Sequence, residues 1–347
     1  MDAKHLYLSS GYVNMHGIIN DGFPVSLVIG GRGTGKTFGA LSDVLDYNTK
    51  FLFMRRTQSQ IDIVSKNEFS PFRKICSVRG IEIVSESISK YNAGFYIAEE
   101  QEEGVFRGVG APIGYSAALS TFSNIRGFDA SDVTLLIYDE FIPERHERPI
   151  KNEFDALMNC YETINRNREL ENKPPLKMLC MANANDLANP VFIGLNLVKK
   201  ATQMQLQGKS IYQDTKRGIA LYFLNDSPIS DAKSQTALYK LTAGTQFASM
   251  SLGNEFASND IGRLGSKPLK EYVPIVAVGE LCIYQHKSRD EYYISTHYSG
   301  SPPTYTAGEA DLARFRRAYG WIWIEYLRDS ITFEDYLCQV LLAKYFK

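Results

Sequence analysis

The residues from Gly30 to Thr37, GGRGTGKT, match the pattern GxxxxGK[ST] at every fixed position. In such a loop, glycines let successive backbone N–H groups turn toward phosphate oxygens, and the N-terminus of the following helix adds to the attraction. An apolar strand pattern precedes the loop and a helical pattern follows it. The sequence therefore predicts a phosphate-binding loop, in preference to a glycine-rich turn that binds nothing.

Two side chains of this loop would contact the nucleotide and its metal directly. Lys36 would reach the β and γ phosphates, and the Thr37 hydroxyl would bind Mg²⁺. The predicted nucleotide contacts are Gly30, Gly31, Arg32, Gly33, Thr34, Gly35, Lys36 and Thr37.

An acidic pair follows a second apolar run, in the sequence VTLLIYDE from Val133 to Glu140. Ligands bind at the carboxyl ends of strands in open α/β sheets, which is where Asp139 and Glu140 would lie. Asp139 would hold Mg²⁺, and Glu140, pointing the other way along the pleat, would polarise the attacking water. The alternative is a pair of solvated turn residues or a helix cap. An adjacent Asp–Glu pair favours ATP hydrolysis over transfer to a metabolite.

Polar residues at two other strand ends are further candidates. Asn183 and Asn185 follow the run Leu176–Met181, where an amide could sense the γ-phosphate or simply form a turn. The pair Arg55 and Arg56 could face phosphate, a neighbouring subunit or only solvent. The sequence leaves both questions open.

Arg166 and Arg168 lie in the charged stretch NRNRE. Phosphoryl transfer needs a cation that Lys36 alone does not supply, and a guanidinium from an adjacent subunit is one solution. Salt-bridged helix surface is the ordinary interpretation of such a run, and spacing alone favours it.

Composition sets the broad class of the protein. The 347 residues, 44% of them hydrophobic, are enough for two domains. With a formal charge of −1, any nucleic-acid contact must come from local basic patches or from an oligomer. The N-terminus lacks a signal-peptide pattern and no apolar run would span a bilayer, so we expect a cytoplasmic protein without a membrane partner. Five scattered cysteines fit neither a disulfide framework nor a zinc site.

Strand-like runs alternate with amphipathic stretches in the first two thirds of the chain, which predicts an α/β fold with a largely parallel sheet. The predicted strands there are Val25–Ile29, Phe51–Met54, Ile81–Val84, Ala117–Thr121, Val133–Tyr138 and Leu176–Met181. We expect a nucleotide-binding domain over residues 1–198, a polar linker region over 199–231 that includes a short strand at Ile219–Leu224, and a smaller α+β domain over 232–347.

Together, LVIGGRGTGKT, FLFMRR, LLIYDEF, NRNRE and MANANDLANPVFIGLNLV resemble the DNA-packaging (encapsidation) ATPases of small tailed phages of the phi twenty-nine type. The resemblance extends over most of residues 1–200, with a weaker echo at MSLGNEF. It implies a P-loop NTPase of the additional-strand, catalytic-glutamate class that uses ATP and Mg²⁺. By this resemblance, Asp139 is the Mg²⁺-binding aspartate and Glu140 is the catalytic glutamate. Asn183 is the residue that couples hydrolysis to movement. Arg166 is the trans-acting arginine finger, with Arg168 as the second candidate.

The resemblance also implies partners. Such a motor assembles as a homopentameric ring on the portal of a procapsid, drives double-stranded DNA inward and meets a structural packaging RNA. It would work in the host cytoplasm, transiently at the portal vertex, and be absent from the mature virion. Its contacts would be mostly to DNA phosphates. Candidate basic residues are Lys199, Lys200, Lys209, Lys216, Arg217, Arg263, Lys267, Lys270, Arg314, Arg316 and Arg317.

The C-terminal domain of this family resembles an inactive ribonuclease-H-type nuclease that binds nucleic acid. Glu280, Asp290 and Glu291 are the acids near its central predicted strands, and they do not form an obvious two-metal set. Two alternatives to the motor remain: a terminase with an active nuclease, and a nucleotide-gated DNA-binding scaffold without significant hydrolysis.

Overall fold

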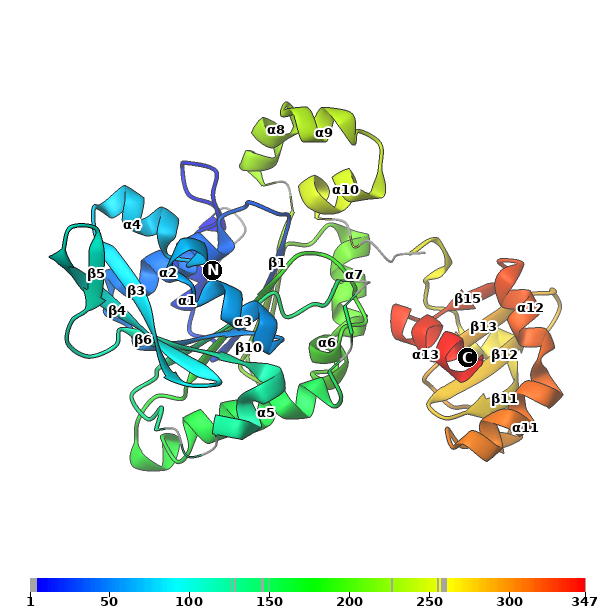
Figure 1. Ribbon diagram of the computed structural model, residues 1–347. Coiled ribbons are helices and arrows are strands. Elements are labelled where there is room, and N and C mark those ends of the chain that lie inside the picture. Colours follow the sequence, from blue (N-terminus) through cyan, green and yellow to red (C-terminus); the bar gives the residue numbers. More distant parts are fainter. Residues whose placement is uncertain are drawn as a thin grey trace. The chain divides into compact units, whose positions relative to one another are not determined.

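The computed structural model describes residues 5–125, 127, 129–144, 147–148, 150–225, 227–254, 256 and 261–346 (Figure 1). The chain forms two compact units. The first comprises Met1–Asp186 and Gly208–Ala257, and the second comprises Leu187–Gln207 and Ser258–Lys347.

A ten-stranded sheet organises the first unit, in the order β3-β4-β6-β2-β7-β8-β1-β10-β9, with β5 paired to β4. The strands from β6 to β10 in this order are mutually parallel, and the others pair antiparallel. Their bounds are β1 (Val25–Gly30), β2 (Phe51–Arg55), β3 (Glu82–Ser89), β4 (Asn92–Glu102), β5 (Val105–Gly108), β6 (Gly114–Ala118), β7 (Leu135–Asp139), β8 (Lys177–Ala182), β9 (Ile211–Asp214) and β10 (Ile219–Leu224).

Helices cover both faces of this sheet, as a parallel sheet requires. On one face, Phe53 belongs to a core shared with α1 (Met15–Ile19), α2 (Lys36–Asp46), α3 (Gln58–Val64) and α4 (Arg73–Arg79). On the opposite face, the next residue along β2, Met54, places its sulfur 3.9 Å from that of Cys160 on α5 (Glu153–Asn165). The predicted α/β class is therefore confirmed.

Two parts of this sheet differ from the sequence prediction. The predicted strand at Ile81–Val84 is longer and antiparallel, and it forms an extension with β4 and β5 that was not predicted. The expected linker over 199–231 contains α7 (Val198–Gln207) and the antiparallel pair β9 and β10. All six residues of β10 are buried beside β1. Burial of this apolar strand therefore keeps the segment in the sheet, although the sequence before it is polar.

After β10 the chain continues in the first unit as three short helices, α8 (Pro228–Ser234), α9 (Ala237–Leu241) and α10 (Gln246–Gly253). The sequence placed most of this segment in the C-terminal domain. Short 3₁₀ helices complete the chain: η2 (Asn67–Phe69), η3 (Leu119–Ile125), η4 (Glu169–Glu171), η5 (Ile261–Arg263) and η6 (Leu269–Glu271).

The second unit is an α+β unit, as predicted. Its five-stranded sheet has the order β14-β11-β12-β13-β15. Apolar residues of its strands pack with Phe315, Ile322 and Leu342 of the helices that follow. Its elements are α6 (Pro190–Gly194), α7, β11 (Tyr272–Val278), β12 (Leu281–His286), β13 (Tyr292–Ser295), β14 (Thr304–Tyr305), α11 (Glu309–Tyr319), α12 (Trp321–Leu327), β15 (Ile331–Phe333) and α13 (Tyr336–Phe346).

All five cysteines are buried free thiols. Within the described ranges, no helix combines the length and the apolar character needed to cross a membrane.

A buried arginine, Arg56, connects the carboxyl end of the central strand β2 to α5. The Arg56 side chain is 0% exposed, and its Nε and Nη2 donate to the two carboxylate oxygens of Glu153 at 2.8 and 3.0 Å. Nη1 donates to Glu147 at 2.8 Å, and the Tyr138 hydroxyl donates to Glu153 at 3.0 Å. The group thus joins β2, β7 and the first turn of α5.

Replacing Arg56 by methionine should lower the free energy of unfolding by about 3–5 kcal/mol, because Glu153 would remain buried without its partner. Urea unfolding of the full chain measures this. Arg79→Met is the matched control, because Arg79 pairs with the half-exposed Asp46 and should contribute less than about 1 kcal/mol. Equal losses in the two variants would contradict this role for Arg56.

Candidate active site

The predicted phosphate loop joins the end of β1 to the start of α2. Gly33 and Gly35 have φ angles of +73° and +92°, which residues with a side chain rarely adopt. Lys36 Nζ turns back along the loop and donates to the carbonyl oxygens of Gly30 at 2.7 Å and Gly31 at 3.0 Å. The loop therefore has the strand, turn and helix arrangement that its sequence predicts.

The motif accepts any residue at position 31, but the packing of neighbouring segments requires glycine there. A Cβ atom there would lie 2.2 Å from the carbonyl oxygen of Ser251 on α10. Directly after α10, Asn254 Nδ2 donates to the Ile29 carbonyl oxygen at 3.2 Å. The helices after β10 thus pack directly against the back of the loop.

Burial of the Lys36 ammonium lowers its pKa to about 8, an effect that the nearby Asp139 carboxylate opposes. Desolvation disfavours the charged form of a buried lysine. A bound phosphate would supply the negative charge that favours the protonated form. Lys36 is therefore suited to hold an anion at this position.

Thr37 and Asp139 lie together at the carboxyl edge of the sheet. The Thr37 hydroxyl donates to Asp139 Oδ2 at 3.1 Å. A hydroxyl and a carboxylate are the oxygen ligands that Mg²⁺ prefers, and Mg²⁺ usually keeps water and phosphate oxygens in its remaining positions. These two residues therefore fit the predicted Mg²⁺ site.

Glu140 does not follow the alternation of the strand that precedes it. It lies just after β7, and its φ of +57° turns its side chain back toward the same side as Asp139. Arg55 shows this, because it forms ion pairs with both carboxylates. The expectation that Glu140 would point the other way along the pleat was wrong, since the left-handed turn ends the pleat.

The same geometry affects the acidity of Glu140. Desolvation in the cleft is the largest cause that raises the pKa of its carboxyl, and Asp139 raises it further while Arg55 opposes the shift. A raised pKa makes a carboxylate a better proton acceptor near neutral pH. The pKa of Glu140 is thus shifted in the direction that a general base requires.

Arg55 is a site residue that the sequence did not separate from its neighbour Arg56. Its Nη2 donates to Asp139 Oδ2 at 2.9 Å, and its side chain is 14% exposed. Met54 pairs with Tyr138 in the parallel register of β2 and β7, so Arg55 extends beside Asp139. The sequence contained a signal for this role, because Arg55 is the last residue of a predicted strand. When that strand lies beside the strand that ends in the acidic pair, both ends reach the same edge of the sheet.

The structure separates the two asparagines. Asn183 Oδ1 accepts a hydrogen bond from Lys36 Nζ at 3.3 Å, at the end of β8, which lies between β1 and β7 in the sheet. Asn185 is buried, and its Nδ2 donates to the Ile142 carbonyl oxygen at 3.3 Å. Asn183 is the one that faces the site.

Three neighbouring parallel strands, β1, β8 and β7, thus deliver the candidate residues to one cleft of about 360 Å³. Its lining consists of Arg32, Gly33, Thr34, Gly35, Lys36, Thr37, Phe38, Asp139, Glu140, Ala182 and Asn183. Of the predicted site residues, Gly30, Gly31 and Arg166 do not line the cleft.

Arg166 and Arg168 have different surroundings. Arg168 donates to the backbone carbonyl oxygens of Val133 at 2.7 Å and Ser131 at 3.3 Å. Arg166 follows the last turn of α5 with a φ of +47°, and its side chain is 52% exposed, 3.8 Å from the exposed Asp129. Arg168 therefore supports the start of β7, whereas Arg166 is exposed at the surface.

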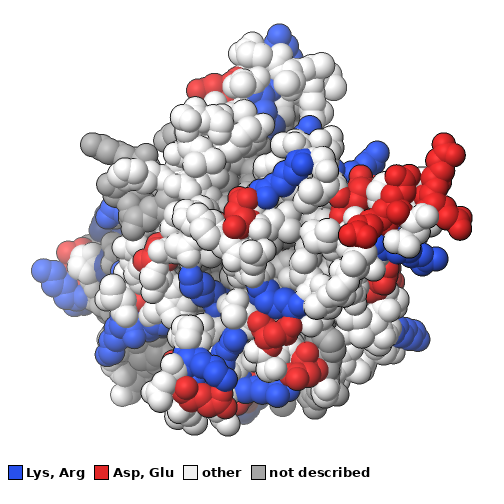
Figure 2. All heavy atoms as spheres, turned by 90° about the vertical axis from the view of Figure 1, so that its left-hand side faces the viewer, with Lys and Arg blue, Asp and Glu red and all other residues white. Residues whose placement is uncertain are grey.

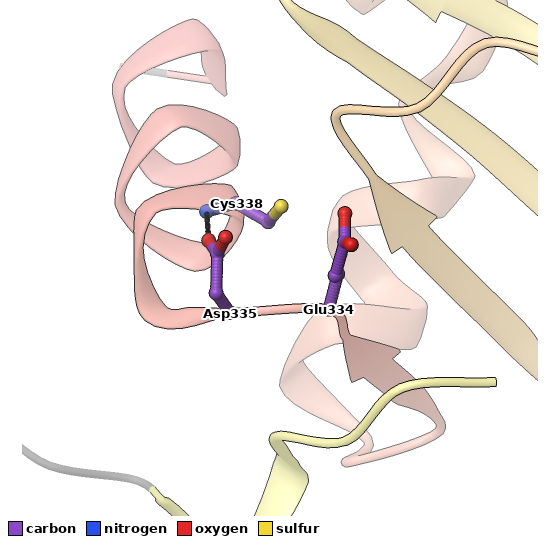
Figure 3. Close-up of side chains that lie close together, drawn as sticks. All are labelled: Glu334, Asp335 and Cys338. Carbon is purple, nitrogen blue, oxygen red and sulfur yellow. Dashed lines mark hydrogen bonds between the residues drawn. The ribbon is translucent and has the colours of Figure 1, made fainter. Parts of the chain in front are cut away.

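Glu280, Asp290 and Glu291, which the sequence did not combine into a two-metal set, belong to no ligand cluster among the described residues. Among the described residues, a different group, Glu334, Asp335 and Cys338, brings three ligand-type atoms within 4.8 Å of one another (Figure 3). Asp335 accepts from the Cys338 backbone N–H at 3.1 Å in the first turn of α13, and Lys199 Nζ lies 2.6 Å from Glu334. Helix capping and an ion pair account for this group.

Several candidate DNA-binding cations already have protein partners. Lys199 pairs with Glu334, and Arg316 Nε donates to the Tyr345 carbonyl oxygen at 2.7 Å. Arg263 donates to a backbone oxygen at 2.7 Å. On the face drawn in Figure 2, basic side chains are interspersed with acidic ones, and the described residues form no continuous basic surface there. The patch that contacts DNA remains a prediction.

The model of the podovirus DNA encapsidation protein (Gp16) family matches residues 8–301 of this chain. The chain belongs to this family. The resemblance inferred from the sequence motifs is therefore confirmed. The family match includes the phosphate loop, the acidic pair and most of both units.

Relatives of this Gp16-family chain come from Bacillus phages. The DNA packaging protein of phage phi29 is 27% identical over 238 residues, which are 67% of this chain and 62% of that protein. The DNA packaging protein of phage B103 is 25% identical over 240 residues, 68% of this chain and 65% of that protein. These alignments thus span less than two thirds of each relative.

Solved structures share the fold of this Gp16-family chain. A chain of the bacteriophage Phi-29 viral genome packaging motor assembly has a TM-score of 0.67 at 19% identity, covering 97% of this chain and 99% of that one. A chain of the Phi-28 gp11 DNA packaging motor has a TM-score of 0.57 at 20% identity, covering 98% and 97%. The P-loop NTPase-like fold class is confirmed.

Glu334 makes the stability of the second unit of this Gp16-family protein dependent on pH. Burial alone would raise its pKa, but hydrogen bonds from Lys199, Ser295 and His297 lower the pKa to about 2. Because the folded pKa lies below the ordinary value of 4.5, the carboxylate stabilises the second unit fully above about pH 4.5 and loses this effect as the pH falls toward 2.

Urea unfolding at several pH values measures this effect. The loss of stability between pH 4.5 and 2.5 should be smaller in Glu334→Gln than in the wild type. Glu280→Gln is the control, because Glu280 has no salt bridge among the described residues and should leave the pH profile unchanged. Identical profiles for wild type and Glu334→Gln would contradict the assignment.

Proposed function

We propose that this protein is an ATP-driven motor that moves double-stranded viral DNA into a procapsid. The observation that carries the proposal is the convergence of Lys36, Thr37, Asp139 and Glu140 on one cleft at the carboxyl edge of a parallel sheet. The names of the relatives, DNA packaging protein and packaging motor, support the link from ATP hydrolysis to DNA.

Five residues that line the cleft take part in the proposed hydrolysis: Lys36, Thr37, Asp139, Glu140 and Asn183. Lys36 and the loop would hold the β and γ phosphates. Thr37 and Asp139 would hold Mg²⁺, whose charge would stabilise negative charge on those phosphates. Glu140 accepts the proton of the attacking water, consistent with its raised pKa. Asn183, hydrogen-bonded to Lys36, is placed to respond when the γ-phosphate leaves.

Arg166 completes the site of a neighbouring subunit. Arg168, two residues away, contacts Val133 at the start of β7, whereas Asp139 ends that strand. Val133 lies two residues before β7 and Asp139 is its last residue, so about 20 Å of extended chain separates the two residues, which lie at opposite edges of the sheet. Arg166 is therefore remote from its own cleft, and its exposure suits it to reach another subunit.

Family membership supports the remaining parts of the proposed motor. We propose a homopentameric ring on the portal of the procapsid, in contact with a packaging RNA, active in the host cytoplasm and absent from the mature virion. Residues 1–198 would supply the ATPase core, and the C-terminal region would bind nucleic acid without nuclease activity. Modest basic patches from several subunits would add up around a polyanion.

Glu140→Gln should bind ATP with nearly unchanged affinity and lose turnover, because it removes the proton acceptor and leaves the phosphate loop intact. Phosphate release, with and without double-stranded DNA, and equilibrium ATP binding measure the two effects. Glu169→Gln, outside the cleft, is the matched control. Retained turnover in Glu140→Gln would refute the role of Glu140, and absence of turnover in the wild type would favour a binding-only scaffold.

Mixing two inactive variants tests the trans-acting finger. Arg166→Ala and Glu140→Gln should each lose about 10³-fold or more in turnover. A mixed assembly should regain phosphate release, because an intact Glu140 in one subunit can meet an intact Arg166 from the next. Arg168→Ala should reduce stability more than turnover. A mixture as inactive as its components would contradict action in trans.

A further inference from the structure

A lysine from the three helices after β10 lies against the phosphate loop. Lys233 Nζ, on α8, donates to the Arg32 carbonyl oxygen of the loop. A Cβ atom on Gly33 would lie 3.1 Å from the same nitrogen. Because Gly33 lines the phosphate cleft, the Lys233 ammonium is next to the residues that would surround the phosphates. Folding thus brings to the loop a cation that lies 201 residues from Arg32 in the sequence.

Packing on two sides holds α8 in this place. Pro228, at the start of α8, packs against the N-terminal segment, since a Cβ atom on Gly11 would lie 3.2 Å from the Pro228 Cβ. α8 also contacts α10, whose Ser251 carbonyl oxygen lies against Gly31 of the loop. The backbone that carries Lys233 is therefore held beside the loop, and only the side chain needs to turn to reach a phosphate oxygen.

Lys233 pairs with no carboxylate among the described residues, in contrast to Arg32, which pairs with Glu144. Its ammonium lies 5.1 Å from the centre of the Tyr239 ring. An ammonium has three N–H donors, so two remain free after the hydrogen bond to the loop. Burial is the main cause that lowers the pKa of Lys36, and the charge of Lys233 lowers it further. The loop therefore brings together two lysine cations that an anion would stabilise.

We propose that Lys233 binds the phosphate chain of the nucleotide in its own subunit, as a second lysine beside Lys36. The inference rests on the proposed function, because it requires the phosphates to occupy the loop. The ammonium would use its free donors for a phosphate oxygen and offset part of the negative charge there. Because Lys233 belongs to the helices after β10, the same contact would hold this segment against the loop while nucleotide is bound.

Calorimetric titration of the full chain with Mg²⁺ complexes of ATP and of inorganic tripolyphosphate tests the proposal. Lys233→Met removes the charge and keeps most of the stem. Both affinities should fall about tenfold, because each complex loses one charge-assisted hydrogen bond. Lys233→Arg keeps a charged donor and should retain most of the affinity. Lys240→Met, which changes an exposed lysine on α9 of the same segment, is the matched control and should bind like the wild type.

A charge contact and a packing contact give different results in these titrations. The difference between the wild type and Lys233→Met should shrink at high salt, because screening weakens interactions between charges. Wild-type affinity of Lys233→Met for both ligands would overturn the phosphate contact. A loss that Lys233→Arg does not restore, or a loss for ATP without one for tripolyphosphate, would also overturn it. Unchanged binding of both ligands by Lys36→Ala would instead overturn the proposed phosphate site itself.

Discussion

A buried lysine sets the main constraint on the first unit. The Lys36 ammonium is withdrawn from water and donates to two loop carbonyl oxygens and to Asn183, and no carboxylate of the described residues forms a salt bridge with it. Desolvation of this charge is costly unless an anion arrives. The sheet must therefore bring the strand ends of β1, β8 and β7 to one edge, so that the phosphate loop, the amide and the Asp139 carboxylate surround the same small volume.

Contacts far apart in the sequence maintain this arrangement. Tyr12 packs on the loop from the N-terminal segment, Leu224 of β10 packs against Gly30, and Ser251 of α10 packs against Gly31. The loop is thus held from outside by three segments, while its inner side is available to phosphate. Direct packing thus connects the loop to three segments that are distant from it in the sequence.

The parts of the fold that local patterns determine were predictable. Continuous apolar runs identified β1, β2, β7, β8 and β10, and the motif identified Lys36 and Thr37. The strand predicted at Ala117–Thr121 was placed three residues too late, because β6 spans Gly114–Ala118 and η3 follows it. Features that depend on non-local pairing or on one backbone angle were not predictable. The left-handed turn at Glu140 reversed the direction expected from the pleat, and β9–β10 joined the sheet because of burial beside β1. Glu334 was missed because Lys199, its partner, lies 135 residues earlier.

A crystal structure with Mn²⁺ and a non-hydrolysable ATP analogue tests the central claim most directly. Anomalous scattering would locate the metal. We expect it within about 2.2 Å of the Thr37 hydroxyl oxygen, with Asp139 in its coordination sphere and Lys36 Nζ on the β and γ phosphates. A metal and triphosphate bound elsewhere, with Lys36 still occupied only by Gly30 and Gly31, would contradict the account.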